Sequence, residues 1–257
     1  MKELSYSLSG ATTGGSVVAG SSATVPISTE GTTTLTYFAR DNAGNWEAPK
    51  TLTVQIDKTK PVITGSRSPA PNATGWNNTN VTVSFSCADV GSVPSGIATN
   101  TVAGQTLSAE GAGQSVTNTG SCLDKAGNAA DPVTVSGINI DKAPPSITVS
   151  ANPTTLWPPN GKMVPVTIAG TITDAASGVN ASTATYAVTD EYGSVQPSGK
   201  VTPGSNGSYS FTIQLQASRN GNDKDGRQYI ITVSVQDNAG NKGSAATGVT
   251  VPHDQGH

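Results

Sequence analysis

The side chains with the clearest chemical potential are aspartates that follow two cysteines. Asp89 stands two residues after Cys87, and Asp124 stands two residues after Cys122. In an extended chain, residues two positions apart point to the same side. Each carboxylate is therefore expected on the side of its cysteine. If the cysteines meet, the carboxylates converge and must share a proton, be separated by water or bind a cation.

The same spacing recurs without cysteines. Asp174 follows Ile172 and Asp237 follows Val235, so the carboxylate pair does not depend on a disulfide. Two interpretations are open. A hard cation, Ca²⁺ above all, could be bound by each pair together with an aspartate from the preceding linker. Alternatively, each aspartate caps its own turn. The predicted groups are Asp57, Asp89 and Asp124, and Asp141, Asp174 and Asp237.

A third acidic segment runs from residue 220 to 226 and is similar to an EF-hand loop. Asn222, Asp223 and Asp225 are its candidate metal ligands, but position 232, where an EF-hand carries its bidentate Glu, is Thr. A plain hairpin loop rich in Asn, Asp and Gly is the alternative.

Alternating residues predict the elements that position these side chains. Segments 81–87, 209–215 and 229–235 alternate apolar with polar residues. This period of two is typical of half-buried strands in antiparallel sheets. The pattern Asp-x-Ala-Gly-Asn occurs at 41–45, 124–128 and 237–241, and Gly and Asn are expected to supply positive φ angles for a hairpin there. The sequence therefore predicts an all-β fold of antiparallel β-sandwiches.

Repetition of this pattern predicts three tandem units. The first two hairpin motifs are 83 residues apart, and an Asp-Lys element followed by Pro recurs 84 residues later, at 57–61 and 141–144. Pro at these points favours an extended connection between domains. We expect an incomplete domain at 1–59, a domain with a disulfide at 60–143 and an enlarged domain at 144–257. The first unit is too short to contain the first two strands, A and B.

Cys87 and Cys122 are predicted to form the disulfide of the second unit. Both point inward by their strand period, and an immunoglobulin sandwich bridges its two sheets at the corresponding strands. Two buried free thiols are the alternative. A disulfide implies an oxidising, extracellular location.

Several motifs resemble the tandem immunoglobulin-like (Big/HYR-like) repeats of bacterial surface and secreted proteins. Segments 27–31, 35–45 and 53–58 carry this resemblance in the first unit. Segments 156–163 and 223–227 make the third unit similar to a module found near the C-terminus of large secreted bacterial proteins. The resemblance implies immunoglobulin-like sandwiches but not a particular function, because the family serves as both spacer and binding scaffold.

Composition excludes several functional classes. The net charge is −3 and 12% of the residues are charged, which does not fit nucleic-acid binding. His253 and His257 are the only histidines, so the strands offer no His base or ligand for nucleophilic or metal catalysis. No apolar run is long enough to span a membrane, and the first residues do not have the pattern of a signal peptide.

These observations favour a non-catalytic structural or spacer segment that requires no cofactor, with the Ca²⁺ considered above as a candidate ligand. Two other features keep alternatives open. Trp157 could form part of a glycan-binding surface, or it could pack over a core. An adhesive or glycan-binding module is therefore the first alternative function. The incomplete first unit would expose an apolar face to solvent, which allows a fibre subunit that receives strands from another copy. The residues expected on this face are Tyr37, Ala39, Leu52, Val54 and Ile56. The partners considered are thus further copies of the chain, or a surface glycan or protein.

Overall fold

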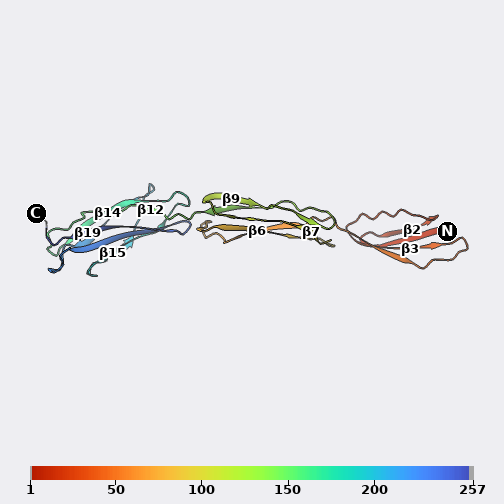
Figure 1. Cartoon of the computed structure of the whole chain (residues 1–257), viewed down its shortest axis with the longest axis horizontal. Helices are drawn as coiled ribbons and strands as arrows, with labels where there is room; N and C mark the ends of the chain where they lie inside the picture. Colours follow the sequence, from red (N-terminus) through yellow and green to blue (C-terminus); the bar gives the residue numbers. More distant parts are fainter. Residues whose placement is uncertain (1, 255–257) are drawn as a thin grey trace. The chain divides into compact units, whose positions relative to one another are not determined.

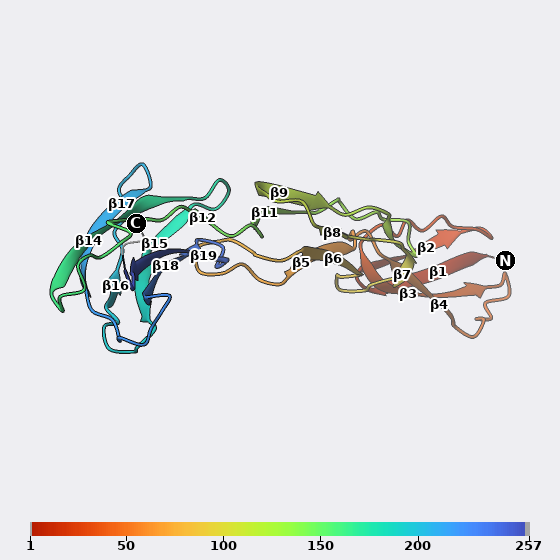
Figure 2. The ribbon, with the colours of Figure 1, turned by 60° about the vertical axis from the view of Figure 1, so that its left-hand side comes forward.

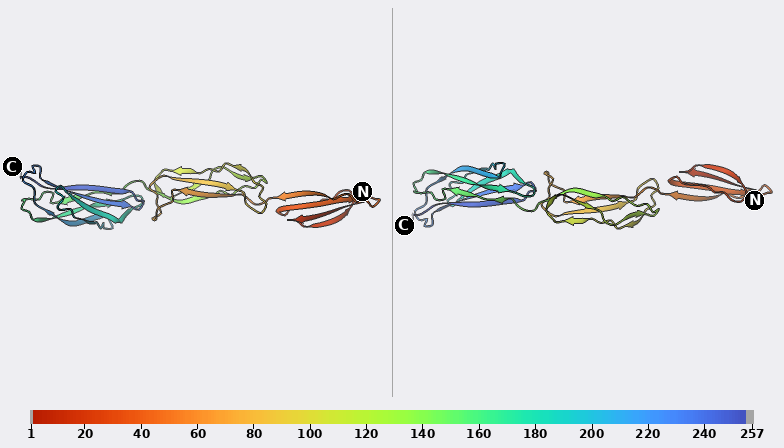
Figure 3. Two further views of the ribbon diagram at one scale, coloured as in Figure 1. Left: turned by 90° about the horizontal axis from the view of Figure 1, so that it is seen from below. Right: turned by 90° about the horizontal axis from the view of Figure 1, so that it is seen from above.

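The computed structural model describes residues 2–254 and contains only β-strands, turns and irregular segments. Nineteen strands are present in this part of the chain, and antiparallel pairs occur in its N-terminal, middle and C-terminal regions. Figures 1 and 3 show these strands along the whole chain. The predicted all-β class with antiparallel sheets is confirmed. Among the described residues, no helix is long and apolar enough to cross a membrane.

The chain divides into two compact units. The first consists of residues 1–67, 83–105 and 116–135, and the second of residues 68–82, 106–115 and 136–257. The division runs through the segment that we expect to be the middle domain. The boundaries near 59 and 143 therefore stay a prediction.

The N-terminal part forms one four-stranded sheet in the order β2–β1–β3–β4, with its strands side by side in Figure 2. Its strands are β1 (Glu3–Gly10), β2 (Gly14–Ala19), β3 (Gly31–Arg40) and β4 (Lys50–Ile56). Leu8 lies opposite Leu35, and Leu35 lies opposite Leu52. The register thus gathers the apolar residues of three strands on one face.

This apolar face is only partly covered. Residues 2–56 form no second sheet, and a hollow of about 250 Å³ lies between the strands and Ala23 and Val25 of the irregular segment before β3. Leu52 is 53% exposed, whereas Ala39, which we expected to face solvent, is buried. Tyr37 on the same face is half-buried. The expectation of an open apolar face therefore holds at Leu52 and fails at Ala39, while Val54 and Ile56 of β4 are half-buried like Tyr37.

The middle part of the chain contains three small sheets. They are β5–β6–β8, β10–β7 and β11–β9. The strands are β5 (Val62–Ser68), β6 (Val81–Ala88), β7 (Ile97–Asn100), β8 (Gln105–Leu107), β9 (Gly111–Thr117), β10 (Cys122–Asp124) and β11 (Thr134–Ile140). A disulfide joins Cys87 of β6 to Cys122 of β10, with Cα atoms 5.8 Å apart. It therefore links strands of two different sheets, as an immunoglobulin-type bridge does.

The C-terminal part has two sheets that enclose the largest core. One contains β12 (Ser146–Ile147), β13 (Ser150–Asn152), β14 (Met163–Thr173) and β17 (Ser208–Gln216). The other has the order β16–β15–β18–β19, with β15 (Val179–Asp190), β16 (Ser198–Lys200), β18 (Arg227–Asp237) and β19 (Lys242–Val251). Alternate residues of β18, from Tyr229 to Val235, are buried in this core. The predicted alternation therefore sets the inward face of the strand.

An ion pair lies at one end of this core. Arg227 of β18 is 1% exposed and Asp190 of β15 is 4% exposed. The guanidinium Nε donates to Oδ1 at 2.8 Å and Nη2 donates to Oδ2 at 2.6 Å. The guanidinium carbon also lies 4.8 Å from the ring centres of Tyr192 and Tyr229. This two-pronged geometry fixes where β15 and the start of β18 meet.

Candidate metal centres

The hairpin after β10 holds the first candidate ligand in place. The Asn128 amide N–H donates to Oδ1 of Asp124 at 2.7 Å, and the Asn128 side-chain Nδ2 donates to Oδ2 at 2.8 Å. Gly127 has φ 95°, a value that a residue with a side chain rarely adopts. Among the described residues only glycines have positive φ, so the expectation that Asn also supplies such an angle is wrong. Asp124 is thereby oriented by its own turn.

The other two hairpins repeat this arrangement. Asn241 donates to Asp237 through its backbone N at 2.8 Å and through Nδ2 at 2.7 Å. Asn45 donates to Asp41 in the same way, with both distances 2.8 Å. The hydrogen bonds from Asn45 lower the pKa of Asp41. The predicted capping of turns by aspartates is therefore present at all three hairpins.

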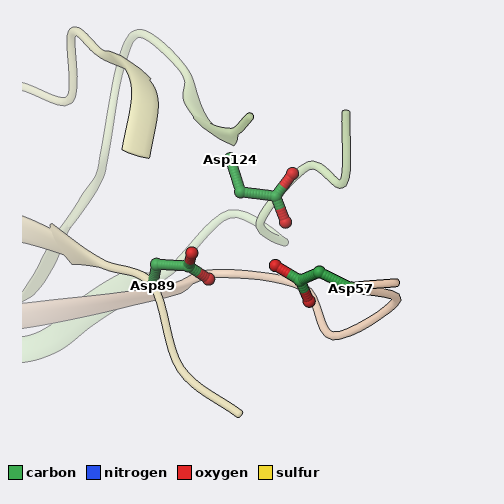
Figure 4. A group of neighbouring side chains, drawn as sticks. All are labelled: Asp57, Asp89 and Asp124. Atoms are coloured by element: carbon green, nitrogen blue, oxygen red, sulfur yellow. The ribbon is translucent and has the colours of Figure 1, made fainter. Parts of the chain in front are cut away.

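Two further carboxylates join Asp124 from separate segments. Asp89 follows β6 and accepts the Gly96 N–H at 2.6 Å through Oδ2, and Asp57 follows β4 and accepts the Ser95 N–H at 2.8 Å through Oδ2. Figure 4 shows the three side chains pointing toward one another. Adjacent donors of one Ser-Gly loop thus orient both carboxylates.

The spacing of the three carboxylates suits one cation. One oxygen from each of Asp57, Asp89 and Asp124 lies within 4.8 Å of the others. Because Ca²⁺ lies about 2.3–2.6 Å from its oxygen ligands, two ligands of one ion can be up to about 5 Å apart. Asp124 is fully buried at 1% exposure, while the other two are half-buried. The group can therefore supply three ligands and leave further coordination positions to water or backbone oxygens.

The second predicted group has the same construction. Asp141, Asp174 and Asp237 also have oxygens within 4.8 Å of one another. Asp141 accepts the Ser177 N–H at 3.0 Å, and Asp174 accepts the Gly178 N–H at 2.6 Å. Asp141 and Asp237 are buried. The structure thus brings together all six aspartates in the two groups that the strand period and the repeated linker element predict.

Neither group has a basic side chain to balance its charge. Among residues 2–254, none of the six carboxylates forms an ion pair with Lys, Arg or His. Oδ1 of Asp89 is buried and has no hydrogen-bond partner. The pKa of Asp57 is lowered, first by its hydrogen bond with Ser95, so this carboxylate is ionised at neutral pH. Turn capping accounts for the individual bonds but does not require three like charges to converge.

Four residues that complete these groups are missed by sequence reasoning. Asn128 Nδ2 donates to the carbonyl oxygen of Asp57 at 3.2 Å, and Asn241 Nδ2 donates to that of Asp141 at 2.9 Å. Each hairpin thus holds the linker backbone as well as its own carboxylate. The remaining two are the serines that bond the linker aspartates. The dipeptide Ser-Gly, which recurs at 95–96 and 177–178, is the sequence signal that could have found them.

The acidic loop at 220–226 is arranged differently. Asp223 accepts hydrogen bonds from the Tyr192 hydroxyl and from the Gly226 N–H. The Tyr192 bond is the first cause of the lowered pKa of Asp223. Asn222 and Asp225 are exposed. Its carboxylates form no group of three in the part of the chain that the structure describes, so the metal site here stays a prediction without geometric support.

Two other sequence features lie away from the carboxylate groups. Trp157 is exposed, and its neighbour Leu156 is the residue buried in the core. The packing interpretation of Trp157 is therefore wrong. His253 is part-exposed beside Asp254 near the end of the described chain, and His257 lies outside the described residues.

Comparisons with known proteins return distant structural likenesses. No protein family model matches the chain, and no curated protein matches it. The chain is similar to a tetra-tandem repeat in the extending region of a large adhesion protein, with 20% identity and a TM-score of 0.34 over 98% of this chain and 67% of that one. It is also similar to fibronectin(III)-like modules of Clostridium thermocellum CbhA, with 10% identity and a TM-score of 0.31 over 76% of this chain and 99% of that one. The chain is similar as well to the extracellular cadherin domains 3–6 of protocadherin gamma B2, with 10% identity and a TM-score of 0.32 over 97% of this chain and 65% of that one. At these TM-scores, none of the likenesses bears on function.

Proposed function

We propose that this chain is a non-catalytic structural segment of an extracellular protein, and that Ca²⁺ bound by its two groups of three aspartates stiffens it. The observation that carries the proposal is the repeated convergence of three aspartates without a basic partner. Ca²⁺ prefers carboxylate and carbonyl oxygens, which are the ligands that the two groups can offer. The disulfide between Cys87 and Cys122 supports an oxidising, extracellular setting.

The expected mechanical effect follows from the positions of the ligands. Asp57 lies between β4 and β5, Asp89 follows β6 and Asp124 ends β10. A cation bound to all three would tie the connecting segment to the ends of two strands. The carbonyl of Asp57 is already held by Asn128, so the ion would reinforce a contact that the protein makes without it. The same reasoning applies to Asp141, Asp174 and Asp237.

Thermal unfolding with Ca²⁺ or with a chelator tests this function. Mass action gives about 2.7 kcal/mol of stabilisation per site at a hundredfold excess over Kd, so millimolar Ca²⁺ is expected to raise Tm. Asp89→Asn should remove part of this increase. Asp41→Asn is the matched control, because Asp41 caps the same kind of hairpin without belonging to a three-carboxylate group.

The outcomes separate the two interpretations of the aspartates. A Ca²⁺ response that Asp89→Asn weakens and Asp41→Asn retains supports the proposal. Equal Tm values in Ca²⁺ and chelator would leave turn capping as the whole role of the six aspartates.

A further inference from the structure

The first of the three repeated hairpins carries an aromatic residue that the other two lack. Trp46 directly follows the motif that ends at Asn45, whereas Ala129 and Lys242 stand at the corresponding positions of the later hairpins. Trp46 is 52% exposed. Its hairpin also differs because Asp41 does not belong to a three-carboxylate group. The same turn is therefore free for a different use in the first unit.

Neighbouring side chains hold the indole of Trp46 in one orientation. The guanidinium carbon of Arg40 lies 5.0 Å from the centre of its ring, and the ring of Phe38 meets it edge-on at 5.4 Å. Arg40 is itself fixed, since Nε donates to the Gly44 carbonyl at 3.3 Å and Nη1 lies 3.5 Å from a carboxylate oxygen of Glu3. A ring that is held in this way loses little conformational entropy when a ligand stacks on it.

A shallow hollow of about 460 Å³ lies beside the indole. Its lining residues are Ala39, Arg40, Asp41, Asn45, Trp46 and Glu47. Asp41 and Glu47 both have lowered pKa values, Asp41 through hydrogen bonds from Asn45 and Glu47 through its hydrogen bond with Lys50. The hollow therefore combines one aromatic face with two ionised carboxylates, which act only as hydrogen-bond acceptors.

This combination selects a chemical class of ligand. A pyranose ring has a face of C–H groups that stacks on an indole and hydroxyl groups at its rim that donate to carboxylates. Arg40 lines the hollow and Lys50 is paired with Glu47, so these cations offset part, but not all, of the repulsion that Asp41 and Glu47 exert on an anionic sugar. We propose that the Trp46 hollow is a binding subsite for a neutral saccharide. The proposal goes beyond the structural role given above. It does not depend on bound Ca²⁺, because none of the lining residues is one of the six aspartates in the two candidate metal centres.

NMR spectroscopy of the three indole N–H signals tests the subsite on the full chain. The signals of Trp46, Trp76 and Trp157 are followed while galactose, N-acetylglucosamine or N-acetylneuraminic acid is added in separate titrations. We expect a saturable shift of the Trp46 signal with at least one of the two neutral sugars, with a Kd in the millimolar range, as suits a single stacking contact. Trp76 and Trp157 should not shift, and the acidic sugar should bind about threefold more weakly, as suits one like charge nearby in water.

Variants make the assignment specific. Trp46→Ala should abolish sugar-dependent shifts throughout the spectrum, while Trp157→Ala, which removes another exposed indole, should leave the Trp46 response unchanged. Unchanged signals of the remaining indoles show that each variant is folded, and Trp46→Phe, which keeps an aromatic face, should retain weaker binding.

Three results would overturn the proposal. The first is no saturable shift with either neutral sugar up to about 100 mM, well above the Kd expected for a stacking contact. The second is binding that survives Trp46→Ala. The third is equal or tighter binding of the acidic sugar, which would show that the two carboxylates do not select a neutral ligand. None of these outcomes affects the Ca²⁺ proposal, whose test follows Tm.

Discussion

Loss of Arg227 should destabilise the C-terminal part of the chain strongly. Arg227→Met removes the guanidinium but keeps much of the apolar volume. Asp190 then stays 4% exposed without its charged partner. Breaking one partner of a buried pair costs about 3–5 kcal/mol, because the remaining charge is buried and uncompensated. Asp190 keeps N–H donors from Ser194 and Val195 at 2.8 Å, so we expect a value near the lower end, about 3 kcal/mol.

The pH dependence of this loss has a defined sign. Burial alone raises the pKa of Asp190, but hydrogen bonds from Arg227 and from backbone N–H groups outweigh it and hold the pKa well below its usual range. A carboxylate with a depressed folded pKa stabilises the fold above its unfolded pKa of about 3.9, and this contribution is lost as pH falls through the folded value. In Arg227→Met, burial still raises the pKa of Asp190, but the guanidinium no longer lowers it. The variant lacks the guanidinium's part of this depression, so the difference between wild type and variant should hold from pH 7 to about pH 4 and shrink as pH falls further.

Hydrogen exchange with mass spectrometry is the suitable assay, because a chain with more than one compact unit need not unfold in one step. Peptides that cover β15 and β18 report the affected region. The double variant Arg227→Met/Asp190→Asn should recover part of the loss, because it also removes the buried charge. A loss below about 1 kcal/mol in the single variant, or no recovery in the double variant, would refute the reasoning.

Three further predictions concern other parts of the chain. Reduction of the Cys87–Cys122 disulfide, which closes a loop of 35 residues, should cost about 3–4 kcal/mol in the chain-entropy model, measured by denaturant unfolding with and without reductant; an unchanged midpoint would contradict it. Burial raises the pKa of Tyr229 to about 12, so its contribution to stability should be lost as pH rises from about 10 toward that value, a loss that Tyr229→Phe should remove from the hydrogen exchange of β18. The open face beside β4 should favour self-association, which light scattering at high concentration detects; Leu52→Glu should reduce it, and a strictly monomeric wild type would exclude the fibre alternative.

The two-residue period of side chains in strands made the aspartates at the strand ends predictable. Asp89 and Asp124 could be placed together because each stands two residues from an inward-pointing cysteine. The linker aspartates followed from repetition of the Asp-Lys element. Their adjacent donors in the Ser-Gly loops could not be derived in the same way, because Asp89 precedes Gly96 by seven residues and Asp174 precedes Gly178 by four. The two loops differ in length, so only the hydrogen bonds show that Gly96 and Gly178 have the same role.

Other features depend on packing that a single sequence does not specify. Arg227 has the inward parity of Tyr229, but the charge of an arginine opposes burial, and only its partner Asp190, 37 residues away, makes its burial possible. The predicted packing of Trp157 fails for a similar reason. Its neighbour Leu156 fills the core instead, and an apolar pair in a Pro-rich segment does not show which member turns inward.

Counting bound Ca²⁺ tests the central claim most directly. Isothermal titration calorimetry on the chain after chelator treatment should give two Ca²⁺ per wild-type chain. Asp124→Asn and Asp237→Asn, which each remove a buried ligand from one group, should each bind one, and the double variant should bind none. Asp41→Asn should still bind two. Absence of binding to the wild type, or a stoichiometry that the Asp124 and Asp237 variants leave unchanged, would contradict the assignment of the two groups as calcium sites.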